Sequence, residues 1–263
     1  MKKKIISLLM LSVLICTNIF GLSKYTTFES EAVLEAFGWY TMPNTNGERP
    51  SLPSEFSYIS DNGGVFLGED EKVLYLTFDA GYANENVEKI LDVLKEKDVK
   101  GSFFLNGGIF KFEADVVKRI SDEGHLVCNH TENHKNLSKI NDFEQYKYEV
   151  EKLAERYKEL CGKEIGKYLR PPEGEINKTA MEYNKKLGYK TVFWSIAYAD
   201  WDNKNQMSYE KAINTVLGRT HNGGIVLLHP TSKTNAAIIG TLIDRWREMG
   251  YSFKTLDELP ESL

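Results

Sequence analysis

From Lys72 onward, short apolar runs rich in strand formers alternate with segments that carry apolar residues at helical spacing. Strands are expected at 73–78, 101–105, 125–129, 168–170, 191–194, 225–228 and 251–253. Helices are expected at 87–94, 112–120, 143–160, 177–187, 208–219 and 235–249. This alternation predicts an α/β fold with a parallel sheet. Seven strands joined by crossover helices indicate one barrel, complete or incomplete, rather than two domains.

Two N-terminal segments precede this pattern. Residues 1–23 begin with three lysines followed by an apolar run, which is typical of an export signal cleaved after Ser23. The alternative is an uncleaved membrane anchor, because the apolar stretch is close to the minimum for spanning a bilayer. Residues 24–70 are rich in proline and glycine, which predicts an irregular extension wrapped on the domain, with one short helix near 29–37. The catalytic domain is expected at 71–263.

The composition excludes some functions and leaves others open. The 263 residues are 41% hydrophobic, so a folded core is expected, and the formal net charge is -5. Export would remove three lysines and no acids, changing the charge from -5 to -8. Such an acidic protein is a poor nucleic-acid binder. Cys128 and Cys161 are expected to be free thiols, and the protein is expected to be an extracytoplasmic monomer.

Five polar features fall at or just after the ends of predicted strands, and parallel strands bring those ends to one face. They are Asp79, the His130 region, Arg170, Asp200 and His229. Asp79 at the tip of an apolar strand is a candidate general base, although an Asp there is also a common helix cap. His229, which ends another apolar strand, is a candidate acid, although a lone histidine is more often structural.

Three further segments could complete a site. His130 and His134 have the spacing of two imidazoles on one helical turn, which suits a metal, although two surface histidines are the alternative. In Arg170-Pro171-Pro172-Glu173-Gly174, prolines hold a rigid turn from which the arginine can clamp a carboxylate. In the segment 193–201, Tyr198 and Trp201 are candidates for an aromatic wall against sugars, whereas Trp194 is expected to pack in the core.

The order of the motifs TFDAGY, HTENH, RPPEG, AYADW and LLHP resembles the polysaccharide deacetylase family, also called carbohydrate esterase family 4 or the NodB-homology domain. The resemblance covers about residues 70–260. VLYLTFD, LRPP and TVFWSIAYADW, with Gly38-Trp39 and Asn46-Gly47, resemble the sporulation branch. That branch deacetylates N-acetylmuramic acid in peptidoglycan on the route to the muramic δ-lactam of spore cortex.

The resemblance implies a distorted (β/α)₇ barrel and one divalent metal ion, zinc in many relatives. It implies that glycan strands of peptidoglycan are the partner. The roles that it implies are a base at Asp79, an acid at His229, metal ligands at His130 and His134, a partner of the base at Arg170, a partner of the acid at Asp200, an oxyanion-facing backbone N–H at Glu173, and substrate contacts at Tyr82 and Trp201.

Position 80 departs from the family pattern, because many relatives have a second Asp there as a metal ligand and this chain has Ala80. The metal would then be held by two imidazoles and solvent, with Asp79 as a further candidate ligand, which leaves metals other than zinc open. Two alternatives to a muramic acid deacetylase remain. One is a deacetylase acting on N-acetylglucosamine in peptidoglycan or a chitin-like polymer, and the other is a catalytically silent glycan-binding protein.

Overall fold

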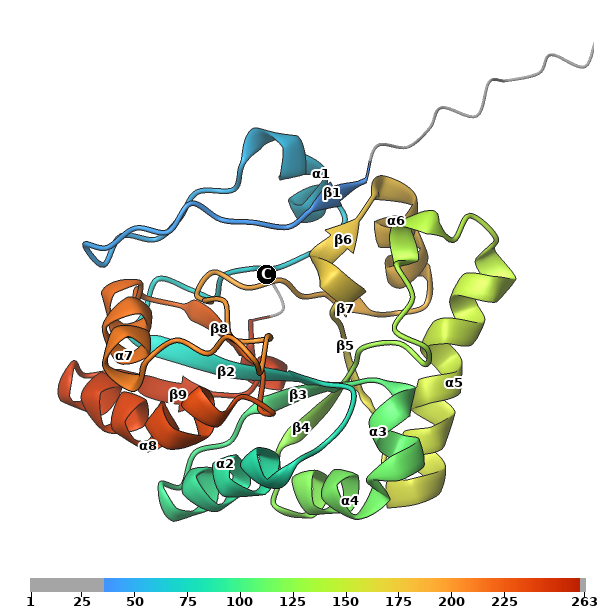
Figure 1. Cartoon of the computed structure of the whole chain (residues 1–263). Coiled ribbons are helices and arrows are strands. Elements are labelled where there is room, and N and C mark those ends of the chain that lie inside the picture. The colour runs from blue at the N-terminus through green and yellow to red at the C-terminus, as the bar shows by residue number, and fades with distance from the viewer. Residues whose placement is uncertain (1–35, 261–263) are drawn as a thin grey trace, which may run out of the picture. The chain divides into compact units, whose positions relative to one another are not determined.

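The computed structural model describes residues 36–260 and has a mixed α/β architecture (Figure 1). One parallel sheet contains β2 (Val73–Ala80), β3 (Ser102–Leu105), β4 (Leu126–Asn129), β5 (Gly166–Leu169), β7 (Lys190–Thr191), β8 (Gly224–Leu228) and β9 (Ser252–Lys254). Its order is β7-β5-β4-β3-β2-β8, and β9 also pairs with β2. The seven predicted strands are all present, and the predicted parallel sheet is confirmed.

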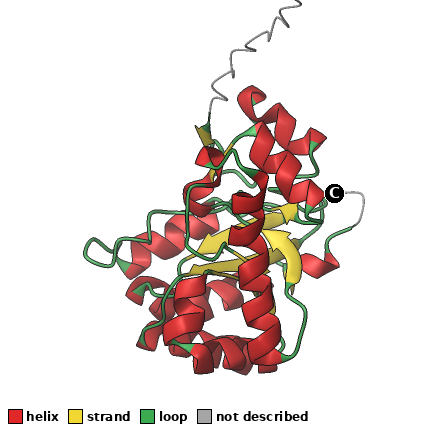
Figure 2. Cartoon of the chain, turned by 90° about the vertical axis from the view of Figure 1, so that its right-hand side faces the viewer, coloured by secondary structure: helices red, strands yellow, loops and turns green. Residues whose placement is uncertain are grey.

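The helices lie outside the strands (Figures 1 and 2). They are α1 (Ser57–Asp61), α2 (Glu85–Glu96), α3 (Gly107–Phe112), α4 (Ala114–Asp122), α5 (Phe143–Cys161), α6 (Lys178–Lys186), α7 (Tyr209–Gly218) and α8 (Lys233–Glu248). Side-chain caps start several of them: Asn84 and Asp142 each accept a backbone N–H in the first turn of α2 and α5.

The sheet curls into a barrel that is not fully closed. Beyond the short β7, the chain runs on as far as Ile196, which forms an isolated parallel bridge with Val226 of β8. Val65 of the N-terminal extension bridges Val192 in the same way. The predicted distorted barrel is therefore confirmed, and single bridges rather than a regular ladder join its two edges.

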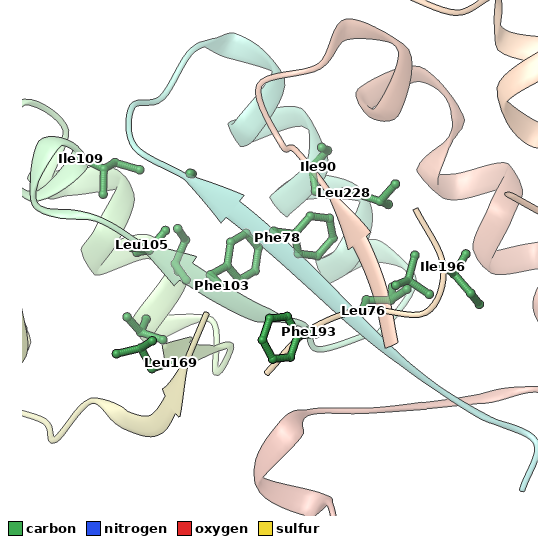
Figure 3. Close-up of a cluster of buried hydrophobic side chains, with 14 of the residues drawn as sticks. Leu76, Phe78, Ile90, Phe103, Leu105, Ile109, Leu169, Phe193, Ile196 and Leu228 are labelled. Carbon is green, nitrogen blue, oxygen red and sulfur yellow. The ribbon is translucent and has the colours of Figure 1, made fainter. Parts of the chain in front are cut away.

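Two apolar clusters lie on the two faces of the sheet. All eight residues of β2 are buried, as expected for a parallel strand covered on both sides. Leu76 and Phe78 belong to the larger cluster, with Phe103 and Leu228 from the neighbouring strands (Figure 3). Tyr75 belongs to the smaller cluster on the other face. Side chains alternate along a strand, so Thr77 and Asp79, two and four residues after Tyr75, face the inside of the barrel.

Three local predictions need correction. The expected helix over 112–120 is two helices, separated at Glu113, and Phe112 is 69% exposed rather than on a buried face. Phe37, at the end of the expected helix 29–37, lies in the strand β1 (Phe37–Gly38), which pairs with β6 (Glu175–Ile176). Ala36 before it is not helical, and residues 29–35 lie outside the described residues.

The predicted export signal or anchor at 1–23 also lies outside the described residues. Within residues 36–260, none of the helices is long and apolar enough to cross a membrane. Cys128 and Cys161 are both free, as expected.

Candidate active site

The carboxyl ends of β2 and β5 meet in a buried ion pair. Arg170 Nη1 donates to Asp79 Oδ1 at 2.6 Å, and Nη2 donates to the Thr77 hydroxyl at 2.9 Å. The Arg170 side chain is fully buried, and that of Asp79 is 8% exposed. Burial by itself would raise the pKa of Asp79, but the charge of Arg170 and its hydrogen bond hold that pKa below its usual range. The carboxylate is therefore ionised at neutral pH, and the predicted pairing is confirmed.

A second buried carboxylate holds the histidine at the end of β8. Asp200, 1% exposed, accepts a hydrogen bond from His229 Nδ1 at 2.7 Å and from the His229 backbone N–H at 2.8 Å. Asn235 Nδ2 donates at 2.6 Å to Oδ2 of the same carboxylate, the oxygen that also accepts the His229 backbone N–H. Burial lowers the pKa of His229, but the hydrogen bond and charge of Asp200 outweigh it and raise that pKa above its usual value. The Nε2 atom is left free to exchange a proton.

The two histidines of HTENH come together, but not on a helical turn as predicted. Residues 130–136 form an irregular loop in which Thr131 and His134 have positive φ angles of 68° and 53°. The His130 and His134 rings nevertheless lie edge to face, with centroids 4.8 Å apart. The i, i+4 spacing therefore predicted the neighbourhood correctly and the backbone conformation wrongly.

His130 is oriented by its backbone surroundings. Its Nδ1 lies 2.8 Å from the Arg170 carbonyl oxygen, which can only accept, so Nδ1 carries the proton and Nε2 has the free lone pair. That Nε2 lies 3.9 Å from Asp79 Oδ2. Burial lowers the pKa of His130 to about 4, so the ring is neutral at pH 7. A neutral imidazole with its other nitrogen bonded to a carbonyl is the usual state of a metal-binding histidine.

These side chains border one cavity of about 630 Å³, which is lined by Asp79, His130, His134, Pro171, Glu173, Gly174, Trp194, Ala197, Tyr198, Ala199, Trp201, Leu227 and His229. Trp201 is 68% exposed at this cavity, which suits the predicted wall for a sugar. The expectation for Trp194 was wrong in part: it packs against the core and also lines the cavity. The indole is large enough to do both.

The Glu173 loop contributes backbone as well as side chain. Glu173 adopts φ 61°, a left-handed conformation that is uncommon for a non-glycine residue. Across residues 36–260 its N–H meets no protein acceptor, which leaves this donor available to a ligand. Tyr82, by contrast, lies outside the cavity lining. It is 51% exposed, and its hydroxyl accepts a hydrogen bond from Asn203 at 2.9 Å.

The sequence-based prediction missed several supporting residues, above all Glu149 on α5. This fully buried carboxylate accepts the backbone and side-chain N–H groups of Asn133 at 2.9 and 3.0 Å, and Lys135 lies 3.0 Å from it. Its Oε atoms thus anchor both residues that flank His134. The available signal was its position: Glu149 falls on the apolar stripe formed by Tyr146, Val150 and Leu153.

The donors fit a metal in type but do not form a complete ligand set. Two adjacent imidazoles and a carboxylate are ligands that zinc and related ions take. Ala80 supplies no ligand atom and belongs to the larger apolar cluster. Among residues 36–260, no group of three His, Cys, Asp or Glu side chains is arranged to hold a metal ion. The His130 and His134 rings lie side by side, and Asp79 Oδ2 lies 3.9 Å from His130 Nε2.

Comparison with known proteins agrees with this fold. Residues 67–192 match the polysaccharide deacetylase family, and the chain belongs to that family. It is 37% identical, over 88% of this chain and 89% of the relative, to the peptidoglycan-N-acetylmuramic acid deacetylase PdaA of Bacillus subtilis (strain 168). A solved structure of Bacillus subtilis PdaA, described as a family 4 carbohydrate esterase, matches with a TM-score of 0.82 and 36% identity over 86% of this chain and 97% of that one.

A second relative acts on a different sugar. The peptidoglycan-N-acetylglucosamine deacetylase of Bacillus cereus is 33% identical, over 78% of this chain and 74% of that protein. The two relatives are both peptidoglycan deacetylases, and they differ in the sugar on which they act.

Proposed function

We propose that this protein is an exported, metal-dependent hydrolase that removes the N-acetyl group of N-acetylmuramic acid in peptidoglycan, releasing acetate and a free amino sugar. One observation carries the catalytic part of the proposal. Asp79 and His229 line the same cavity, and each is paired with a buried partner that favours its charged form. The choice of sugar rests on the similarity to the muramic acid deacetylase over 89% of its length.

Asp79 is the general base. Its lowered pKa keeps it ionised at neutral pH, and its Oδ1 is occupied by Arg170. Oδ2 is therefore the atom that takes a proton from the attacking water as the oxygen of that water bonds to the acetyl carbon.

His229 is the general acid. Its Nδ1 is held by Asp200, so Nε2 is the atom that gives its proton to the sugar nitrogen as the carbon–nitrogen bond breaks. An amine is a very poor leaving group without that proton, which is why the raised pKa of His229 matters.

The negative charge that develops on the acetyl oxygen needs donors inside the cavity. The Glu173 N–H, which has no acceptor among the described residues, supplies one. A divalent cation on His130 and His134, when bound, would polarise the acetyl carbonyl and acidify the water. Trp201 provides an apolar face for a sugar ring, and Tyr82 remains a predicted contact beyond the cavity.

The product of this reaction has a free amine close to the lactyl carboxylate of muramic acid, as closure of a δ-lactam requires. We assign the protein to that route in spore cortex on its likeness to the sporulation branch. Export through residues 1–23 would bring the protein to its substrate.

Two other functions have observations in their favour. The 33% identical relative from Bacillus cereus favours an N-acetylglucosamine substrate. The incomplete ligand set and Ala80 favour a glycan-binding protein without activity. The retained Asp79 and His229 pairs speak against the second, because binding alone does not need a base and an acid.

One experiment separates the three. The full chain is incubated with intact and with peptide-stripped peptidoglycan, with zinc, cobalt, manganese or chelator, and acetate and muropeptide masses are measured. We expect acetate release that depends on the metal, and muramic residues lighter by roughly 42 mass units, the difference between an acetyl group and a hydrogen. Asp79→Asn should abolish both changes. Free amines on glucosamine alone would refute the muramic assignment, and glycan binding without acetate release would refute the enzyme.

A further inference from the structure

Trp39 of the N-terminal extension bonds to two segments that line the cavity. Its backbone N–H donates to the Gly174 carbonyl at 2.9 Å, and its indole Nε1–H donates to the Trp194 carbonyl at 2.9 Å. Gly174 and Trp194 both line the cavity, and they belong to two different segments of the chain. Each N–H group of Trp39 therefore holds one of the two segments that form this side of the site.

The indole ring of Trp39 is itself held in place. It is 6% exposed, and its centroid lies 4.6 Å from that of Phe193 and 5.1 Å from those of Phe56 and Phe66. A ring enclosed by three others has little freedom to turn, so the direction of its Nε1–H is fixed. Its two hydrogen bonds therefore act as rigid links and not as adaptable surface contacts.

The Glu173–Gly174 loop, to which the Trp39 backbone N–H bonds, has an unusual backbone conformation that needs support. Glu173 and Gly174 are consecutive left-handed residues, with φ 61° and 68°. A Cβ atom at Gly174 would lie 2.8 Å from Trp194 Cη2 and 3.3 Å from Trp39 Cβ, so the loop backbone is packed directly between the two tryptophans. Strained backbone of this kind persists only where the surroundings hold it.

We propose that Trp39 is a positioning residue for the deacetylation reaction. It fixes the Glu173 N–H relative to the cavity and sets the spacing between the Glu173 loop and Trp194. Trp39 lies outside residues 67–192, the part that matches the family. The extension is thus a working part of the site in this chain, and this inference rests on the proposed function of the Glu173 N–H.

The test compares Trp39→Phe with Tyr40→Phe in the full chain. Both changes keep a six-membered aromatic ring and remove one side-chain hydrogen-bond donor from adjacent residues. The Tyr40 hydroxyl bonds to Glu55 and touches neither cavity segment, so Tyr40→Phe is the matched control. Two quantities are measured: amide hydrogen exchange of a peptide spanning 172–176, and kcat and KM for acetate release from peptidoglycan.

Trp39→Phe keeps the backbone bond to Gly174 and removes the indole bond to the Trp194 carbonyl, which frees the ring that packs against Gly174. Exchange in the 172–176 peptide should then rise several-fold and kcat should fall about fivefold to tenfold, as expected when one buried hydrogen bond that positions the site is lost. KM should stay within about twofold, and Tyr40→Phe should match wild type in both measurements. A lower melting temperature with unchanged kcat and exchange would overturn the proposal, because Trp39 would then only fill the core. If wild-type protein releases no acetate, the proposed function fails, and exchange alone still decides whether Trp39 holds the loop.

Discussion

Replacing Arg170 with methionine tests the buried ion pair on which the base depends. Arg170 bonds to Asp79 and Thr77, and its guanidinium lies 4.1 Å from the centroid of the Phe104 ring. Methionine retains a long, unbranched apolar stem that can occupy this space, and it removes the charge and every donor. The perturbation therefore leaves the carboxylate of Asp79 buried without its cation.

Breaking a buried pair by removing one partner costs about 3–5 kcal/mol, because an uncompensated charge remains. A change of 1 kcal/mol shifts the melting temperature of a 150–250-residue domain by about 2–4 °C, so Arg170→Met should lower it by about 6–20 °C. The pH dependence of the free energy of unfolding follows from the pKa of Asp79. Because its pKa is lowered in the folded protein, ionised Asp79 stabilises the fold above its unfolded pKa, and this stabilisation is lost as pH falls through the folded pKa.

In Arg170→Met, burial acts on Asp79 without the guanidinium, which raises its pKa. As the pH falls, Asp79 of the variant takes up a proton, which removes the cost of its buried charge, while Asp79 of the wild type is still ionised and paired. The difference in unfolding free energy between wild type and variant should therefore be largest at neutral pH and smaller near pH 4.5. Urea unfolding with chelator present measures it, and Arg245→Met is the control. Arg245 is 59% exposed beside Glu248, a pair expected to be worth about 1 kcal/mol or less. An equal loss at both pH values would show that packing, not charge, was removed.

Three further substitutions test other parts of the site. Asp200→Asn should lower the pKa of His229 and move the basic limb of the kcat/KM profile to lower pH; a limb that stays in place would mean that Asp200 does not tune the acid. Glu149→Gln should weaken zinc binding about tenfold by calorimetry, while Glu151→Gln on the exposed face of the same helix leaves it unchanged; equal affinities would refute the anchoring role. Ala80→Asp places a carboxylate at a position that is 4% exposed, so the melting temperature should fall in chelator and recover with zinc, and no recovery would show that position 80 does not reach the cation.

The fold was predictable from the sequence because its main strand is apolar on both faces and its helices have clear periodicity. The prediction was weakest where long-range contacts replace regular pairing. β7 has two residues, and the chain beyond it is held by the bridge from Ile196 to Val226. Nothing local in 191–196 distinguishes a strand from an extended segment placed by such bridges. The break between α3 and α4 at Glu113 was also missed, because no glycine or proline at that point marks the end of a helix.

The residues of the site were predictable to the extent that they end strands. Asp79 is the second-last residue of β2, and Arg170 and His229 directly follow β5 and β8, so the parallel topology alone brings them to one edge. The HTENH loop was less predictable, because Asn129 and Glu149 bond to its backbone N–H groups and replace the bonds that a helix would make. These partners are distant in sequence or belong to another element, so the local pattern does not reveal them.

The two buried pairs, Arg170 with Asp79 and Asp200 with His229, share a design that would separate the proposed chemistry from recognition of the sugar. Arg170 and Asp200 are almost completely buried, and they act in opposite directions: one lowers the pKa of Asp79 and the other raises that of His229. These opposite shifts favour an ionised Asp79 and a protonated His229 without any contribution from the glycan. We therefore expect the choice between muramic acid and glucosamine to lie in the loops that border the cavity, where Glu173 and Trp201 are exposed. Changes in those loops should alter KM and the choice of sugar and leave the pH dependence of the reaction in place.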